Sequence, residues 1–102
     1  GHFSNEPLRV TNVAKAHPVL RGVREFGSSK LYKAGALAKS ATVLQRGDIG
    51  TDKQDVTWVN TLKGGRTFYT SLGVPEDFEN ENFKRLLVNA IFWAAKRDLL
   101  RR

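Results

Sequence analysis

The polar side chains that could carry out acid–base chemistry gather between residues 71 and 77. Ser71 supplies a hydroxyl, and Glu76 and Asp77 form an adjacent pair of carboxylates. Two neighbouring carboxyl groups can act as a general acid and a general base. Adjacent acids just before a helix more often shape a turn or face the positive end of the helix dipole. We therefore favour a structural role for this pair over a catalytic one.

The chain contains few residues that could act as a nucleophile or bind a metal ion. The chain contains no cysteine, which excludes a thiolate nucleophile, a thiolate metal ligand and a disulfide. His2 and His17 are the only histidines, too few for a metal site, and neither adjoins Ser71 in the sequence. A serine nucleophile needs a base beside it. We expect no catalytic residue, no metal and no cofactor.

Two tyrosines are candidates for contacting a ligand. Tyr32 and Tyr69 offer aromatic surfaces with polar tips, which would suit a sugar. The alternative is that both rings fill the core between sheet and helix while their hydroxyls reach water. Together with nearby polar groups, the candidate ligand-binding residues are Tyr32, Tyr69, Ser71 and Glu76.

The composition is that of a small globular domain with a basic surface. The 102 residues carry a net charge of +7, and 40% of them are hydrophobic. The basic residues are mostly scattered singly, which indicates a solvated surface rather than a nucleic-acid interface. No stretch is long and apolar enough to span a membrane. The absence of cysteine fits the cytoplasm and the periplasm alike, so the compartment stays open.

Several short strands are predicted in the first half of the chain. Apolar and β-branched residues alternate or cluster over residues 8–13, 30–33 and 41–45. Residues 46–54 are polar and contain two glycines, which predicts a surface loop.

The clearest local signal is a β-hairpin. Residues 56–62 and 66–72 are rich in β-branched and aromatic side chains, and consecutive glycines lie between them. Glycine adopts the positive φ angles that tight hairpin turns need. In this hairpin Trp58 can face Phe68 or Tyr69, a pairing that stabilises sheets.

A long helix is predicted from Glu81 to Arg97, with Asn80 as its N-cap. Apolar residues recur at intervals of three and four and predict one core face. That face comprises Phe83, Leu86, Leu87, Ala90, Ile91 and Ala94. Further apolar residues lie on the opposite side or flank, which suggests a contact surface. The interface candidates are Val88, Phe92, Trp93 and Leu99.

Residues 66–97 read RTFYTSLGVPEDFENENFKRLLVNAIFWAAKR. This run resembles the end of trehalose-utilisation (ThuA-like) domains, which belong to the class I glutamine-amidotransferase-like superfamily. Residues 65–73 match the family's Gly-Arg-(Val/Thr)-Phe-Tyr-Thr-Ser-Leu-Gly strand, and residues 83–95 match its helix. Residues 17–22, His-Pro-Val-Leu-Arg-Gly, resemble its His-Pro-Ile-x-Arg-Gly segment. Many relatives continue the strand with histidine, where this chain has Val74.

The resemblance and the predicted elements together imply an α/β fold. We expect a mixed sheet with an antiparallel hairpin and a long C-terminal helix, equivalent to the C-terminal part of a flavodoxin-like, glutamine-amidotransferase-like domain. Residues 1–102 would then form a single, partial ThuA-like domain. The resemblance places the strand-turn-helix of the amidotransferase nucleophile in an N-terminal half that this chain lacks.

Three functional hypotheses follow. The first is a non-catalytic or partner-dependent ThuA-like domain of carbohydrate metabolism that binds a sugar or another small molecule. The second is a self-associating interaction module, and the third is a basic nucleic-acid-binding protein. One helix covers only one face of a sheet. We therefore expect either a missing N-terminal half or a homo-oligomer, most simply a two-fold dimer through the sheet.

Overall fold

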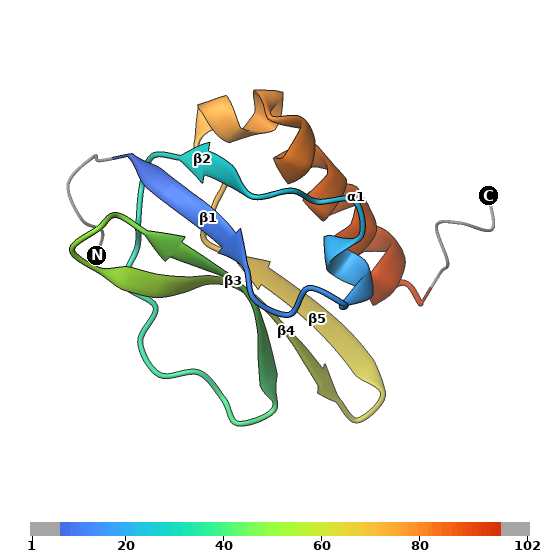
Figure 1. The fold of residues 1–102 in the computed structure, drawn as a ribbon. Coiled ribbons are helices and arrows are strands. Elements are labelled where there is room, and N and C mark those ends of the chain that lie inside the picture. The colour runs from blue at the N-terminus through green and yellow to red at the C-terminus, as the bar shows by residue number, and fades with distance from the viewer. Residues whose placement is uncertain (1–6, 97–102) are drawn as a thin grey trace.

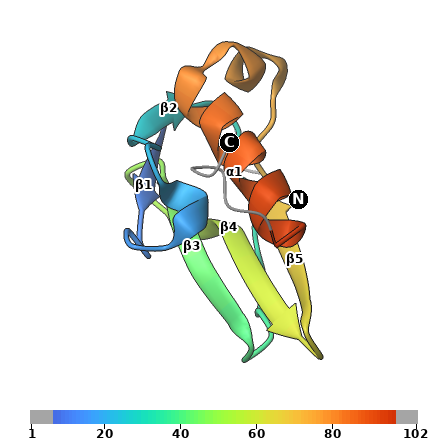
Figure 2. The same cartoon turned by 90° about the vertical axis from the view of Figure 1, so that its right-hand side faces the viewer.

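The computed structural model describes residues 7–96, which form a five-stranded sheet and one α-helix (Figure 1). The helix α1 covers one face of the sheet, and a short 3-10 helix, η1, packs against it (Figure 2). In chain order the elements are β1 (Leu8–Asn12), η1 (Pro18–Leu20), β2 (Phe26–Ser28), β3 (Ala41–Asp48), β4 (Lys53–Leu62), β5 (Gly65–Thr70), η2 (Pro75–Glu79) and α1 (Glu81–Ala94). No helix in the described range is long and apolar enough to cross a membrane.

The strands are ordered β2-β1-β3-β4-β5, and every neighbouring pair is antiparallel. The prediction of a mixed sheet was therefore wrong, although the α/β composition is confirmed. Parallel neighbours need a crossover connection of about a dozen residues or more. Here short turns join β3 to β4 and β4 to β5, so these strands must reverse direction. The resemblance to a flavodoxin-like sheet is not confirmed by this arrangement.

The hairpin formed by β4 and β5 is confirmed. Its turn contains Lys63 and Gly64, both with positive φ angles of 52° and 82°. Trp58 lies directly opposite Tyr69, and the two ring centroids are 4.3 Å apart. Phe68 lies opposite Val59 instead and packs against the core. The aromatic pair therefore consists of Trp58 and Tyr69.

A second hairpin, formed by β3 and β4, replaces most of the predicted loop over residues 46–54. Arg46 and Asp55 face each other across it and form an ion pair with an Nε–Oδ1 distance of 3.0 Å. The turn itself comprises residues 49–52, and the Asp48 carboxylate accepts a hydrogen bond from Gly50 N–H within it at 2.7 Å. The loop prediction was wrong because residues 46–48 pair with residues 53–55 in the ladder, despite their polar side chains.

The strand predicted over residues 30–33 was also misplaced. Only Tyr32 forms an isolated bridge there, and β2 lies earlier, pairing Phe26 with Val10 of β1. Leu31 contributes to the core as a fully buried side chain rather than as part of a ladder. Long-range pairing with β1 therefore decides which short apolar segment becomes the strand.

The helix α1 begins where predicted, since the Asn80 side chain accepts a hydrogen bond from Asn82 N–H at 2.8 Å. It ends at Ala94, earlier than predicted, and Lys96 has a left-handed φ of 58°. Arg97 lies outside the described residues.

The buried face of α1 is narrower than predicted. Phe83, Leu86 and Ala90 are buried as expected and Leu87 is half-buried, but Ile91 is 68% exposed and Ala94 is also exposed. Asn89 is buried instead, and its amide donates hydrogen bonds to the carbonyls of Val19 and Arg21. Backbone groups around η1 need a polar partner, so an asparagine occupies this part of the interface.

Candidate functional site

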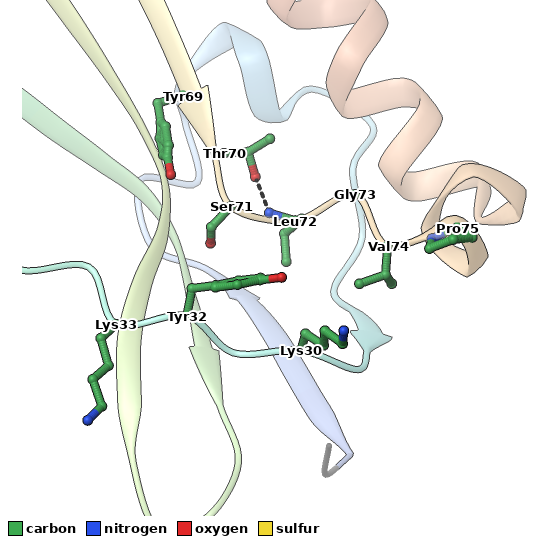
Figure 3. A pocket seen from close by; sticks show the side chains of 10 residues that line it. All are labelled: Lys30, Tyr32, Lys33, Tyr69, Thr70, Ser71, Leu72, Gly73, Val74 and Pro75. Atoms are coloured by element: carbon green, nitrogen blue, oxygen red, sulfur yellow. Dashed lines mark hydrogen bonds between the residues drawn. The ribbon is translucent and has the colours of Figure 1, made fainter. Parts of the chain in front are cut away.

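An open pocket of about 600 Å³ lies where β5 ends, between the chain that follows β2 and the loop that leads to η2 (Figure 3). Most of its walls come from two segments that are distant in the sequence. The lining residues are Lys30, Tyr32, Lys33, Tyr69, Thr70, Ser71, Leu72, Gly73, Val74 and Pro75.

Three of the four predicted ligand-binding residues meet in this pocket, namely Tyr32, Tyr69 and Ser71. Glu76 lines an adjoining pocket together with Asp77. The two pockets share part of their walls, because Lys30, Val74 and Pro75 line both. The fold therefore brings the predicted residues to one region, in two neighbouring hollows.

Ser71 occupies an unusual position at the end of β5. Its backbone N–H donates to the carbonyl of Val56 at 2.8 Å, which continues the sheet ladder by one residue. Its hydroxyl oxygen is buried and forms no hydrogen bond with any of residues 7–96. In Figure 3 this hydroxyl points toward the ring of Tyr32. Buried polar atoms nearly always have partners, so this one calls for an explanation.

The neighbouring Thr70 shows the usual behaviour of a hydroxyl in this region. Its Oγ1 lies 3.1 Å from the Val56 carbonyl and accepts from Leu72 N–H at 3.2 Å. It also lies 3.0 Å from the Thr57 hydroxyl. Thr70 thus holds the end of β5 in place, and Ser71 is left to face the pocket.

Tyr69 does not fill the core between sheet and helix. Its side chain is 44% exposed and its ring rests against Trp58. Tyr32 is half-buried on the opposite wall of the pocket. Core filling, the alternative expected for both tyrosines, does not apply to Tyr69.

The loop between β5 and η2 is held by Asp77, a residue whose anchoring role the sequence did not reveal. Asp77 is 2% exposed, and its carboxylate accepts hydrogen bonds from the Ser28 hydroxyl at 2.8 and 3.0 Å. It also accepts from the N–H of Gly73 at 2.8 Å. Gly73 has a φ of 119°, which disfavours other residues. Asp77 is thus a turn former, as the favoured interpretation of the acidic pair predicted.

Two of the lysines predicted to belong to a solvated surface, Lys30 and Lys33, also line the pocket. The side chain of Lys30 is directed toward the part of the pocket where Val74 lies, whereas the side chain of Lys33 points away from the other lining residues (Figure 3). Single lysines scattered among other residues are typical of a solvated surface, so the sequence does not distinguish these two as pocket residues. The pocket therefore combines hydroxyls, two aromatic rings and cationic side chains.

A comparison with protein families agrees with the resemblance seen in the sequence. The family described as trehalose utilisation, ThuA, matches residues 1–94, a range that includes every residue lining the pocket. The chain belongs to the ThuA family. Membership connects it to trehalose utilisation and so to carbohydrate metabolism. No match was found among curated proteins or among solved structures.

The position at which many ThuA relatives have a histidine is part of the pocket wall. Val74 stands there, and its aliphatic side chain cannot exchange a proton. His17 is not among the lining residues. Its Nδ1 accepts from Val19 N–H at 3.1 Å and caps η1. Within the described part of the chain, no cluster of three histidine, cysteine or acidic residues could hold a metal.

The environment of His17 is shaped by its neighbours on β5 and α1. Its ring meets the indole of Trp93 edge-on at 5.2 Å between centroids. Burial, and next the positive charge of Arg66, lower the pKa of His17 below its ordinary value of 6.5. The imidazole therefore favours its neutral form, which can accept the capping hydrogen bond.

The four predicted interface residues of this ThuA domain lie in different surroundings. Val88 is 41% exposed on α1, and Phe92 is half-buried. Trp93 packs partly against the core, where Arg66 lies over its ring at 5.0 Å and donates to its carbonyl. Leu99 lies outside the described residues.

Proposed function

We propose that this ThuA-family domain binds a sugar or a similar small polar molecule in the pocket between Tyr32, Tyr69 and Ser71. The observation that carries the proposal is the buried Ser71 hydroxyl, which has no partner within residues 7–96 and faces the pocket. Small-molecule sites combine aromatic walls with a few placed polar groups that fix orientation. A sugar hydroxyl would give Ser71 the hydrogen bond that residues 7–96 do not provide.

We further propose that the domain does not catalyse a reaction on its own and works beside a partner segment or protein. Val74 stands where a base would be, and the sequence has no cysteine. His17 is engaged in capping η1 and contacting Trp93. The Asp77 carboxylate is taken up by Ser28 and Gly73, so it does not form an acid–base pair with Glu76.

Sugar binding can be tested through the fluorescence of Trp58, whose ring lies 4.3 Å from that of Tyr69. Trehalose, maltose and glucose are titrated against the purified chain, with NMR chemical shifts as a second readout. We expect saturable binding that weakens about tenfold in Ser71→Ala, the usual effect of losing one hydrogen bond from a buried hydroxyl.

Thr67→Ala is the matched control, because this hydroxyl lies on the same strand, outside the pocket lining, and is directed to the Asn60 carbonyl. We expect it to bind like the wild type. A panel of sugars without any saturable signal in either readout would contradict the proposal.

The proposed lack of catalysis has its own assay. The purified chain is incubated with disaccharides and with glutamine, and we expect no turnover. Turnover that survives repurification and is abolished by Glu76→Gln would restore the acidic pair as catalysts.

Self-association is a second candidate function, favoured by one specific observation. Val88 and Ile91 lie one helical turn apart on α1 and are 41% and 68% exposed. Exposed neighbouring aliphatic side chains favour burial against another surface. A second copy of the chain is the simplest occupant.

A further inference from the structure

Among residues 7–96, the charged groups that line the pocket are cationic. Lys30 and Lys33 contribute to its walls, and no carboxylate in this range does. The nearest acids, Glu76 and Asp77, line the adjoining pocket instead. The binding site considered above is therefore positive as well as rich in hydroxyls.

Lys30 is the cation best placed to meet a ligand. It lines both pockets, and its side chain is directed toward the part of the pocket where Val74 lies (Figure 3). It forms no ion pair with any residue between 7 and 96. No ion pair joins it to Asp77, whose carboxylate accepts hydrogen bonds from Ser28 and Gly73 instead.

We propose that the pocket selects sugars that carry an anionic group, a phosphate ester or a carboxylate, and that Lys30 holds this group. The inference rests on the proposed function and specifies its ligand class. The ammonium of Lys30 supplies three donors and a full positive charge to the anion. Ser71 and the two tyrosine rings meet the sugar itself, so both parts of the ligand add to its affinity.

The surrounding charge favours the same class of ligand. The chain carries a net charge of +7, which raises the local concentration of anions. A general attraction of this kind would act on any anion, whereas a hydrogen bond from Lys30 depends on one side chain. The two effects can therefore be separated by removing one positive charge either at Lys30 or at a lysine outside the pocket.

The experiment compares glucose, glucose 6-phosphate, glucuronate and inorganic phosphate as ligands of the full chain at fixed ionic strength. We expect at least one anionic sugar to bind about tenfold or more tightly than both glucose and inorganic phosphate. Preference for the phosphate ester or for the carboxylate then identifies the anion, and either result supports the proposal.

Lys30→Gln and Lys39→Gln form a matched pair, since each removes one positive charge and Lys39 is an exposed lysine outside the pocket lining. We expect Lys30→Gln to lower the affinity for the anionic sugar about tenfold and to leave glucose binding unchanged. Lys39→Gln should change both affinities by less than about twofold, because Lys39 lies outside the pocket lining. Circular dichroism and urea unfolding confirm that both variants are folded.

The possible failures are distinguishable. Equal binding of glucose and the anionic sugars, unaffected by Lys30→Gln, would overturn this inference and leave the sugar-binding function standing. Equal losses in the two lysine variants would also overturn it, in favour of net charge. Inorganic phosphate that binds as tightly as glucose 6-phosphate, with no binding of glucose, would overturn both proposals.

Discussion

The carboxylate of Asp77 accepts a hydrogen bond from the hydroxyl of Ser28 at 2.8 Å, across a separation of 49 residues. This contact joins η2 to the end of β2, and both segments contribute to the walls of the adjoining pockets. A second hydrogen bond, from Gly73 N–H, fixes the loop that carries Val74. The pocket therefore depends on a buried carboxylate that does not itself line the main cavity.

Asp77→Ala should lower the free energy of unfolding by about 2–4 kcal/mol. The substitution leaves the Gly73 N–H and the Ser28 hydroxyl without their acceptor in a buried place. Urea unfolding followed by tryptophan fluorescence measures the change. Glu76→Ala is the control, since this exposed neighbour should alter stability by less than about 0.5 kcal/mol. Equal stability of both variants would show that Asp77 is not an anchor.

Gly47→Ala should destabilise the domain by about 1–3 kcal/mol through overpacking. A methyl group there would lie 2.8–2.9 Å from side-chain carbons of Leu8, Leu31 and Val56. These three side chains are 0–2% exposed, so they have little room to move away. Urea unfolding tests the prediction.

Gly27→Ala provides the matched control for Gly47→Ala. Its new methyl group would lie no closer than 3.7 Å to the nearest atom, the Leu8 carbonyl oxygen. We expect a change of less than about 0.5 kcal/mol for this exposed strand position. A cost for Gly27→Ala as large as that for Gly47→Ala would point to strand propensity rather than packing.

The stability of the domain should fall as the pH drops below the ordinary His17 pKa of 6.5. Because the folded-state pKa is lowered, the unfolded chain binds the proton first, and acid then favours unfolding. Above that pH both states are neutral at His17, and below the lowered pKa the loss stops growing.

The pH effect can be assigned by comparing urea midpoints of the wild type and His17→Asn between about pH 5 and 8. Asparagine keeps the capping ability but does not titrate. We expect a shallower decrease in the variant. Parallel curves would assign the pH dependence to other groups.

Self-association predicts a light-scattering mass of twice the 11.4 kDa of one chain at micromolar concentration. The exposure of Ile91 moves our proposal from the sheet to the outer side of α1. Ile91→Asp should therefore yield a folded monomer, while Thr61→Asp, which adds the same charge at an exposed position of β4, should leave the dimer intact. A wild-type monomer would rule out the self-associating module.

The hairpin and the start of the helix could be predicted from the sequence, because each depends on residues that are close together in the chain. The glycine turn and the β-branched flanks predicted the β4–β5 hairpin, and Asn80 marked the start of α1. The strand order depends on contacts between distant segments, so composition and periodicity did not reveal that β1 lies between β2 and β3. Helical periodicity also did not set the width of the buried face, and Ile91 was misassigned for that reason.

The candidate site, too, was predictable only where residue type alone carried the signal. Residue type alone selected Tyr32, Tyr69 and Ser71, which the fold brings into one pocket. Lys30 was missed because a lone lysine has no sequence pattern that separates a pocket wall from ordinary surface. The anchoring role of Asp77 depends on Ser28, and nothing in the sequence links two residues so far apart.

The two hydrogen bonds from Asn89 to the carbonyls of Val19 and Arg21 bear on how the chain is made. They span 70 and 68 residues, so the acceptors leave the ribosome well before their donor is synthesised. Until then the segment around η1 has no partner on α1, and the apolar side chains of Val19 and Leu20 remain uncovered. The early part of the chain must therefore wait in an unfinished state until α1 has left the ribosome, and this domain folds only after that point.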